Sequence, residues 1–189
     1  DHGIKKVLLT YGSDRIKRDG LFTTVTQSLA AQGIAFIECG GIVSNPVISK
    51  VREAIALART HQVEAVLAVG GGSVLDSSKA IAAGVLHDGD VWELFTRAAD
   101  IKAALPIFSV LTLAATGSEM NNGAVVTNEE TREKFAIGSP HTFPKVSIVN
   151  PALMQTVSRD YLVYSAADII AHSIEGYFTA KLQPRFQSR

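Results

Sequence analysis

Hydrophobic residues recur along the chain with two spacings that alternate from one segment to the next. Short apolar runs rich in β-branched residues occupy positions 7–10, 34–37 and 65–69, and such runs predict buried strands. Between them, apolar residues recur every three or four positions, first before Gly33 and then before His61, which predicts amphipathic helices. This order of strand, helix, strand, helix and strand favours a Rossmann-like α/β fold, with a parallel sheet and helices on both faces.

The alternation continues through the middle of the chain. The next predicted elements are a helix at 76–83, a loop with Trp92 and Phe95, and strands at 106–111, 123–127, 134–138 and 145–149. A polar turn at 128–132 separates the second and third of these strands. We therefore expect a β-hairpin inserted into the parallel sheet.

A long helical pattern follows the last strand. It starts after Ser158, a residue suited to cap a helix, and continues to about residue 180. We expect residues 1–150 to form a nucleotide-binding α/β domain and residues 151–189 to begin an all-helical domain that is incomplete here. The apolar side of this helix then has only the first domain to pack on.

Composition narrows the classes of partner. Lys and Arg together number 18, as do Asp and Glu, so no basic field attracts nucleic acid or an anionic membrane. Cys39 is the single cysteine and cannot form an internal disulfide, and no apolar run reaches the roughly 20 residues that span a bilayer. We expect a cytoplasmic protein that acts on a small molecule. Homo-oligomers are compatible with this composition.

The amino terminus gives no targeting signal. Residues 1–6 have no apolar stretch behind their charges and do not begin with Met, so they resemble neither a signal peptide nor a natural start.

A glycine-rich segment lies between a predicted strand and a predicted helix. The sequence Gly70-Gly71-Gly72-Ser73 lets the backbone approach a pyrophosphate closely, while the first amides of the following helix direct partial positive charge toward it. Ser73 adds a hydroxyl donor. A flexible turn or a helix cap is the simpler alternative, but the position between strand and helix favours phosphate binding.

Three motifs together resemble those of the iron-containing alcohol dehydrogenases, most closely the branch of butanol dehydrogenases and broad aldehyde reductases. They are GGGSVLDSSKAIA at 70–82, LTLAATGSE at 111–119 and AADIIAHSIEGYFT at 166–179. The resemblance implies a two-domain enzyme of dehydroquinate synthase-like architecture, with NAD or NADP between the domains and a divalent metal on the helical side. It also implies that this chain is an amino-terminal fragment.

The resemblance assigns coenzyme contacts by motif. The residues implied are Gly71, Gly72, Ser73 and Asp76 near the pyrophosphate and ribose–nicotinamide, then Thr112, Thr116 and Ser118 after the next strand, and Lys134 on the hairpin. Two of these have simpler interpretations, because a hairpin lysine is usually just solvated and Thr112 could simply end a strand.

The turn after the first strand bears on the choice of coenzyme. Asp14 could accept the ribose hydroxyls and repel a 2′-phosphate, whereas Arg15 or Lys17 could attract one. Relatives with glycines in place of Ser13 and Asp14 resemble NADP users. The acidic residue therefore favours NAD for this chain.

Asp168 and His172 are candidate metal ligands. Their spacing of four places both on one face of the long helix, about one turn apart. A simple Asp–His hydrogen bond is the alternative, and the motif resemblance favours metal ligation. It also implies two further histidines beyond this sequence, and the remaining histidines, His2, His61, His87 and His141, match no ligand position. The family name suggests Fe²⁺, although Zn²⁺ suits the same ligands.

These features predict a metal-dependent NAD(P)-linked oxidoreductase that interconverts alcohols and aldehydes by hydride transfer. The metal would polarise the substrate oxygen, and this chain alone would be inactive. The alternative is a non-catalytic nucleotide-binding module that binds a cofactor or a partner protein. A related lyase or synthase is disfavoured by the second and third motifs.

Overall fold

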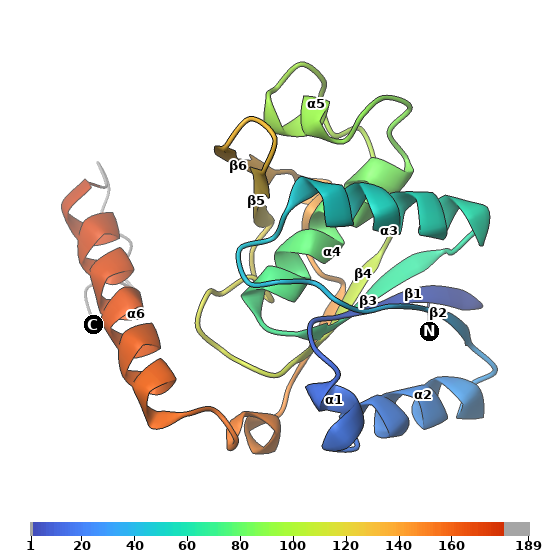
Figure 1. Ribbon diagram of the computed structural model, residues 1–189, viewed down its shortest axis with the longest axis horizontal. Coiled ribbons are helices and arrows are strands. Elements are labelled where there is room, and N and C mark those ends of the chain that lie inside the picture. The colour runs from blue at the N-terminus through green and yellow to red at the C-terminus, as the bar shows by residue number, and fades with distance from the viewer. Residues whose placement is uncertain (1, 180–189) are drawn as a thin grey trace.

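The computed structural model describes residues 2–179, and a five-stranded parallel sheet lies at its centre (Figure 1). The strands are β1 (Lys6–Tyr11), β2 (Ala35–Cys39), β3 (Ala65–Gly70), β4 (Ile107–Leu111) and β7 (Val146–Val149). Their order in the sheet is β2-β1-β3-β4-β7, so the chain builds first on one side of β1 and then on the other. This reversal is the topological switch point at which open α/β sheets bind ligands. The predicted Rossmann-like parallel sheet is confirmed.

Helices cover both faces of the sheet. On one face α3 (Ile48–Thr60) and α4 (Gly72–Val85) pack on Leu8, Val66 and Ile107. On the other face α1 (Arg15–Arg18) and α2 (Leu21–Ala31) lie over the side chains that alternate with these, including Leu9 and Val69. Both faces are therefore buried, which explains why the strands are nearly continuous apolar runs rather than alternating ones.

The predicted hairpin is present and packs on α4. Its strands, β5 (Gly123–Asn128) and β6 (Glu133–Gly138), pair antiparallel, with Thr127 opposite Lys134. Ala124 and Val126 are fully buried in the core beside α4. A short 3₁₀ turn, Pro140–Thr142, leads from the hairpin back to the sheet.

Two predicted elements are corrected. The helix expected at 76–83 is α4, which starts at Gly72 and extends to Val85, because the last glycine of the run and Ser73 already belong to its first turn. The expected loop with Trp92 and Phe95 contains a short helix, α5 (Trp92–Phe95), in which these two rings stack with their centroids 5.2 Å apart. Periodicity could not predict a helix of four residues.

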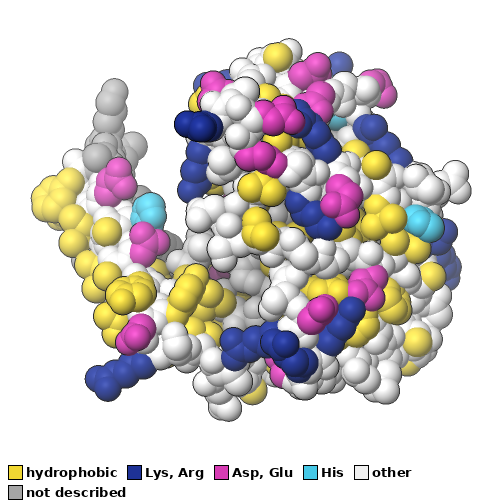
Figure 2. All heavy atoms as spheres, in the orientation of Figure 1, with side chains coloured by type: hydrophobic (Ala, Val, Ile, Leu, Met, Phe, Trp, Pro, Cys, Tyr) yellow, Lys and Arg dark blue, Asp and Glu magenta, His cyan; other side chains and the backbone are white. Residues whose placement is uncertain are grey.

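The long helix α6 (Arg159–Thr179) follows a 3₁₀ turn, Pro151–Met154, and lies at one side of the molecule (Figure 1). Ser158 caps it as predicted, since its Oγ accepts a hydrogen bond from the Tyr161 amide at 3.3 Å. Residue 180, the predicted end, lies outside the described residues. Figure 2 shows hydrophobic side chains along α6, and Ile170 and Phe178 are 59% and 79% exposed. In the part of the chain that the structure describes, no helix is both long and apolar enough to cross a membrane.

Candidate functional site

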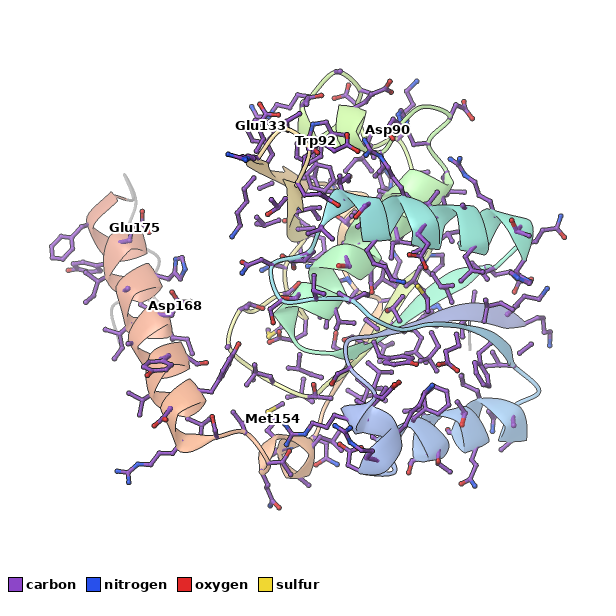
Figure 3. All side chains as sticks on the ribbon, viewed as in Figure 1. Asp90, Trp92, Glu133, Met154, Asp168 and Glu175 are labelled. Atoms are coloured by element: carbon purple, nitrogen blue, oxygen red, sulfur yellow. The ribbon has the colours of Figure 1, made fainter. Side chains whose placement is uncertain are left out.

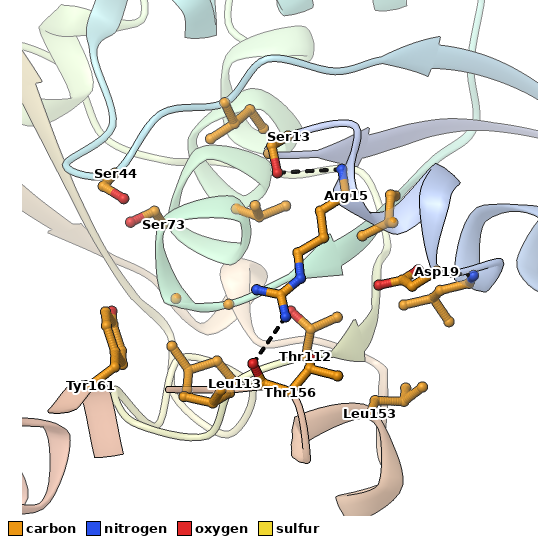
Figure 4. Close-up of a pocket in the computed structure, with 18 of the residues that line it drawn as sticks. Ser13, Arg15, Asp19, Ser44, Ser73, Thr112, Leu113, Leu153, Thr156 and Tyr161 are labelled. Carbon is orange, nitrogen blue, oxygen red and sulfur yellow. Dashed lines mark hydrogen bonds between the residues drawn. The ribbon is translucent and has the colours of Figure 1, made fainter. Parts of the chain in front are cut away.

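A cleft of about 1100 Å³ opens at the carboxyl ends of the parallel strands (Figure 4). The loops that follow β1, β2, β3 and β4 contribute to its walls, together with the segment that enters α6. Its lining includes Gly12, Ser13, Arg15, Gly41, Ser44, Gly71, Gly72, Ser73, Thr112, Leu113, Thr156 and Tyr161. The cleft therefore lies at the switch point between β1 and β3, where the fold brings loops from distant parts of the sequence together.

The amino terminus of α4 forms the centre of this cleft. Gly71 is the N-cap residue in an extended conformation (φ −92°, ψ −166°), and the first turn of the helix contains no acidic side chain. Gly71 also has no side chain that could cap the helix. The first amides of α4, with the partial positive charge of a helix amino terminus, are thus available to an anionic group in the cleft.

Gly71 and Gly72 have no side chain for different physical reasons. A Cβ at Gly72 would collide with the side chain of Thr116, so glycine is needed there to let the loop after β4 pack on α4. A Cβ at Gly71 would instead meet Leu113 at 3.4 Å, an ordinary contact distance. Packing therefore explains Gly72 but not Gly71, and Gly71 keeps the backbone accessible from the cleft.

Arg15 extends across the cleft. Its guanidinium donates a hydrogen bond of 2.9 Å to the carbonyl oxygen of Thr156, which ties the turn after β1 to the segment before α6 (Figure 4). Among the described lining residues, only Arg15 and Asp19 carry a charge. Arg15 is thus the one cationic side chain of this lining.

The structure places the predicted coenzyme residues in two groups. Gly71, Gly72, Ser73 and Thr112 line the cleft, as their motifs suggested, and the remaining five candidates, Asp14, Asp76, Thr116, Ser118 and Lys134, are not among the lining residues. Contact of any of these residues with a coenzyme stays a prediction.

Asp14 and Lys134 lie at exposed positions. The carboxylate of Asp14 is 71% exposed and its Oδ1 lies 3.6 Å from Nζ of Lys17. Lys17 in turn pairs with Glu38 at the end of β2. On the hairpin, Nζ of Lys134 donates to Oδ1 of Asn45 at 3.2 Å.

Asp76 and Ser118 belong to a partly buried polar cluster behind the cleft. Oδ1 of Asp76 accepts a hydrogen bond of 2.6 Å from Oγ of Ser118, and Oδ2 accepts one of 3.0 Å from the amide of Val125. Burial raises the pKa of Asp76, and these two hydrogen bonds oppose that effect. The carboxylate joins α4 to the loop after β4 and to β5.

The metal candidates lie on α6 as predicted. Oδ1 of Asp168 is 3.7 Å from Nε2 of His172, and Figure 3 places Asp168 on the side of α6 that faces the α/β part of the chain. Both side chains are well exposed, at 63% and 74%. No group of three or more His, Cys, Asp or Glu residues that could hold a metal ion occurs among residues 2–179. Metal binding by Asp168 and His172 therefore stays a prediction.

Sequence reasoning missed part of the cleft. The loop after β2, with Gly41 and Ser44, and the segment containing Thr156 also line it. Neither has a phosphate-binding or metal-binding motif. These two segments line the cleft because of the order of the strands in the sheet, which no local spacing of residues predicts.

Comparison with known proteins places this architecture in a family. The sequence profile described as "Iron-containing alcohol dehydrogenase" matches residues 1–151. The chain belongs to this family. The structure of the NADH-dependent butanol dehydrogenase A of Thermotoga maritima superimposes with a TM-score of 0.92 at 48% identity, over 97% of this chain and 46% of that one.

Named alcohol and aldehyde oxidoreductases are also similar to this chain in sequence. A probable NADH-dependent butanol dehydrogenase of Bacillus subtilis is 45% identical over 98% of this chain and 48% of its own length. The NADPH-dependent aldehyde reductase YqhD of Escherichia coli is 38% identical over 96% of this chain and 48% of its own. The chain thus spans about half the length of these relatives.

Proposed function

We propose that this chain forms the coenzyme-binding part and the first half of the metal site of an NAD(P)-linked oxidoreductase that interconverts alcohols and aldehydes. The observation that supports this most is the cleft itself, in which the uncapped amino terminus of α4 and Gly71 lie at the switch point of the sheet. The names of the similar proteins, NADH-dependent butanol dehydrogenase and NADPH-dependent aldehyde reductase, supply the reaction class.

The cleft suits a dinucleotide in size and chemistry. Its volume of about 1100 Å³ is slightly above the roughly 300–1,000 Å³ typical of ligand pockets. The pyrophosphate would lie on the first amides of α4, with the hydroxyl of Ser73 as a further donor. Thr112 would line the path away from it, and the turn after β1 would face the adenosine end.

Residues 1–150 provide this coenzyme domain, and residues 151–189 begin the helical part that holds the metal. Asp168 and His172 would bind a divalent ion from one face of α6, with Fe²⁺ favoured by the family name and Zn²⁺ also suited to a carboxylate and an imidazole. When bound, such an ion acts as a Lewis acid on the alcohol or aldehyde oxygen. The described residues of this chain bind and orient the coenzyme.

The direct test is a fluorescence titration of the purified chain with NADH. We expect saturable binding that NAD⁺ competes away. Reduced nicotinamide mononucleotide, which lacks the adenosine half, should bind much more weakly because it has a single phosphate and leaves the β1 side of the cleft empty. Absence of saturable NADH binding by a folded chain would contradict the proposal.

Coenzyme preference gives a second prediction. We expect wild type to bind NADH more tightly than NADPH, and Asp14→Gly to shift the affinity ratio toward NADPH by about fivefold, as expected for about 1 kcal/mol between exposed charges. The reason is that the exposed Asp14 carboxylate repels a 2′-phosphate in the adjacent turn. Titration of both coenzymes measures the ratio.

Asp88→Gly is the matched control, because Asp88 is also exposed but follows α4 at the end opposite the cleft. It should leave the ratio unchanged. A wild-type preference for NADPH of about tenfold or more would show that Arg15, which lines the cleft, outweighs Asp14.

A further inference from the structure

Lys79 is a fully buried lysine in the middle of α4, with a relative exposure of 0%. Lysines are almost never buried without partners, because the charged form loses its hydration. Here Nζ donates to four oxygens: Ser118 Oγ at 2.9 Å, Asn121 O at 2.8 Å, Asn121 Oδ1 at 3.0 Å and Gly123 O at 2.8 Å. The three N–H donors of one ammonium group are thus distributed over four acceptors.

All these acceptors belong to a single segment, residues 118–123, which connects the loop after β4 to the hairpin strand β5. The segment contributes the backbone carbonyls of Asn121 and Gly123, and both of these hydrogen bonds are partly buried. The Lys79 ammonium thus ties these two carbonyls to α4. Removing it leaves this segment without its central donor.

Asp76 completes the cluster one turn earlier on the same helix. Ser118 Oγ accepts from Lys79 and donates to Asp76, so the hydroxyl links the cation to the carboxylate. The other oxygen of Asp76 accepts from the amide of Val125 in β5. The two charged side chains of α4, three residues apart, thus hold both ends of the segment.

The segment is continuous with a wall of the cleft. Thr112 and Leu113 line the cleft, and Thr116 packs so closely on Gly72 that a Cβ there would collide with it. Only Gly117 separates Thr116 from Ser118, the first residue that Lys79 holds. The position of the wall beside the α4 amino terminus therefore depends on how firmly residues 118–123 are fixed.

We propose that Lys79 is a positioning residue for the coenzyme, which fixes residues 118–123 and through them the Thr112–Thr116 wall against the amino terminus of α4. This inference rests on the proposed coenzyme function of the cleft. Lys79 itself does not line the cleft, so it acts through the loop rather than by contact with the coenzyme.

The charge state of Lys79 gives the inference a pH signature. Burial lowers the pKa of Lys79 to about 8, while the nearby carboxylates of Asp76 on α4 and Glu119 on the loop oppose that shift. The charge of Lys134 on β6 acts on Asp76 in turn. Above this pKa the amine loses its charge and one of its donors, so the loop should loosen as pH rises from 7 to 9.5.

Lys79→Met tests the proposal, because methionine nearly fills the same space without a charge or a donor. At pH 7 we expect NADH affinity to fall about tenfold or more, because even a small displacement of residues 112–116 would weaken their contacts with the coenzyme. Wild-type affinity should also fall between pH 7 and 9.5, whereas that of Lys79→Met should be low and nearly independent of pH. The exposed Lys102→Met is the matched control and should retain both the wild-type affinity and its pH profile.

Asn121→Ala provides a second variant if Lys79→Met does not fold, as judged by circular dichroism. It removes the Oδ1 that accepts from both the Lys79 ammonium and the Gly123 amide, and it should weaken NADH binding about threefold or more, or roughly 0.7 kcal/mol. A folded Lys79→Met, or a folded Asn121→Ala, with wild-type affinity and pH profile would overturn the positioning role alone. Failure of wild type to bind NADH would overturn the proposed function as well.

Discussion

Replacing Gly71 with valine is expected to abolish NADH binding by this chain while leaving its fold intact. Gly71 is the N-cap of α4 and lines the cleft, so a branched side chain there would occupy the space through which a pyrophosphate approaches the helix amides. The backbone at Gly71 is extended, a conformation that suits valine. A Cβ would lie 3.4 Å from Leu113, an ordinary contact.

The loss should exceed about 100-fold in affinity, or roughly 2.8 kcal/mol, because the coenzyme loses several charge-assisted hydrogen bonds at once. Fluorescence titration with NADH measures the affinity, and thermal unfolding shows whether the fold is retained. Ala56→Val is the matched control, since it adds a branched side chain at an exposed position on α3 outside the cleft. Its affinity should equal that of wild type.

Gly72→Val separates the two roles of glycine in this turn. Its side chain would collide with Thr116, so we expect a large loss of stability together with any loss of binding. Wild-type NADH affinity in Gly71→Val would mean that the glycine run is only a turn, and the phosphate site would have to be placed elsewhere.

The parts of the fold that the sequence predicted well are those set by local pattern. The parallel strands are buried on both faces, so their sequences are continuous apolar runs that stand out from the helical spacing. The hairpin could be predicted because a polar turn separates two β-rich segments. The start of α4 was predicted too late, because glycines usually disfavour a helix, whereas here Gly72 lies within the first turn.

The site was less accessible to sequence reasoning because it forms from distant segments. The glycine run and Thr112 were found through motifs, but the loop after β2 and the segment around Thr156 join the cleft only through the strand order. Behind the cleft, the hydrogen bond between Asp76 and Ser118 likewise joins residues 42 positions apart. No spacing along the sequence predicts such a contact, and the burial of Lys79 follows from the same folding of the loop onto α4.

The second large effect expected is an absence of catalysis: the 189-residue chain, supplied with Fe²⁺ or Zn²⁺, NADH and butanal, should show no steady turnover. Asp168 and His172 would provide only two ligands, whereas a catalytic ion of this kind generally has three or more protein ligands and one open position. Both side chains are mostly exposed to water, which competes for the ion. Metal binding should therefore be weak.

Elemental analysis after dialysis measures the bound metal, and the decrease of NADH absorbance measures turnover. His172→Ala should remove the residual metal binding but leave NADH affinity unchanged, because His172 does not line the cleft. Measuring metal binding and NADH affinity on the same variant tests the two parts of the proposed function separately, because coenzyme binding would depend on the sheet and metal binding on α6. Tight stoichiometric metal with steady turnover would contradict the prediction, and it would require ligands from His141 or from a second copy of the chain to complete the coordination.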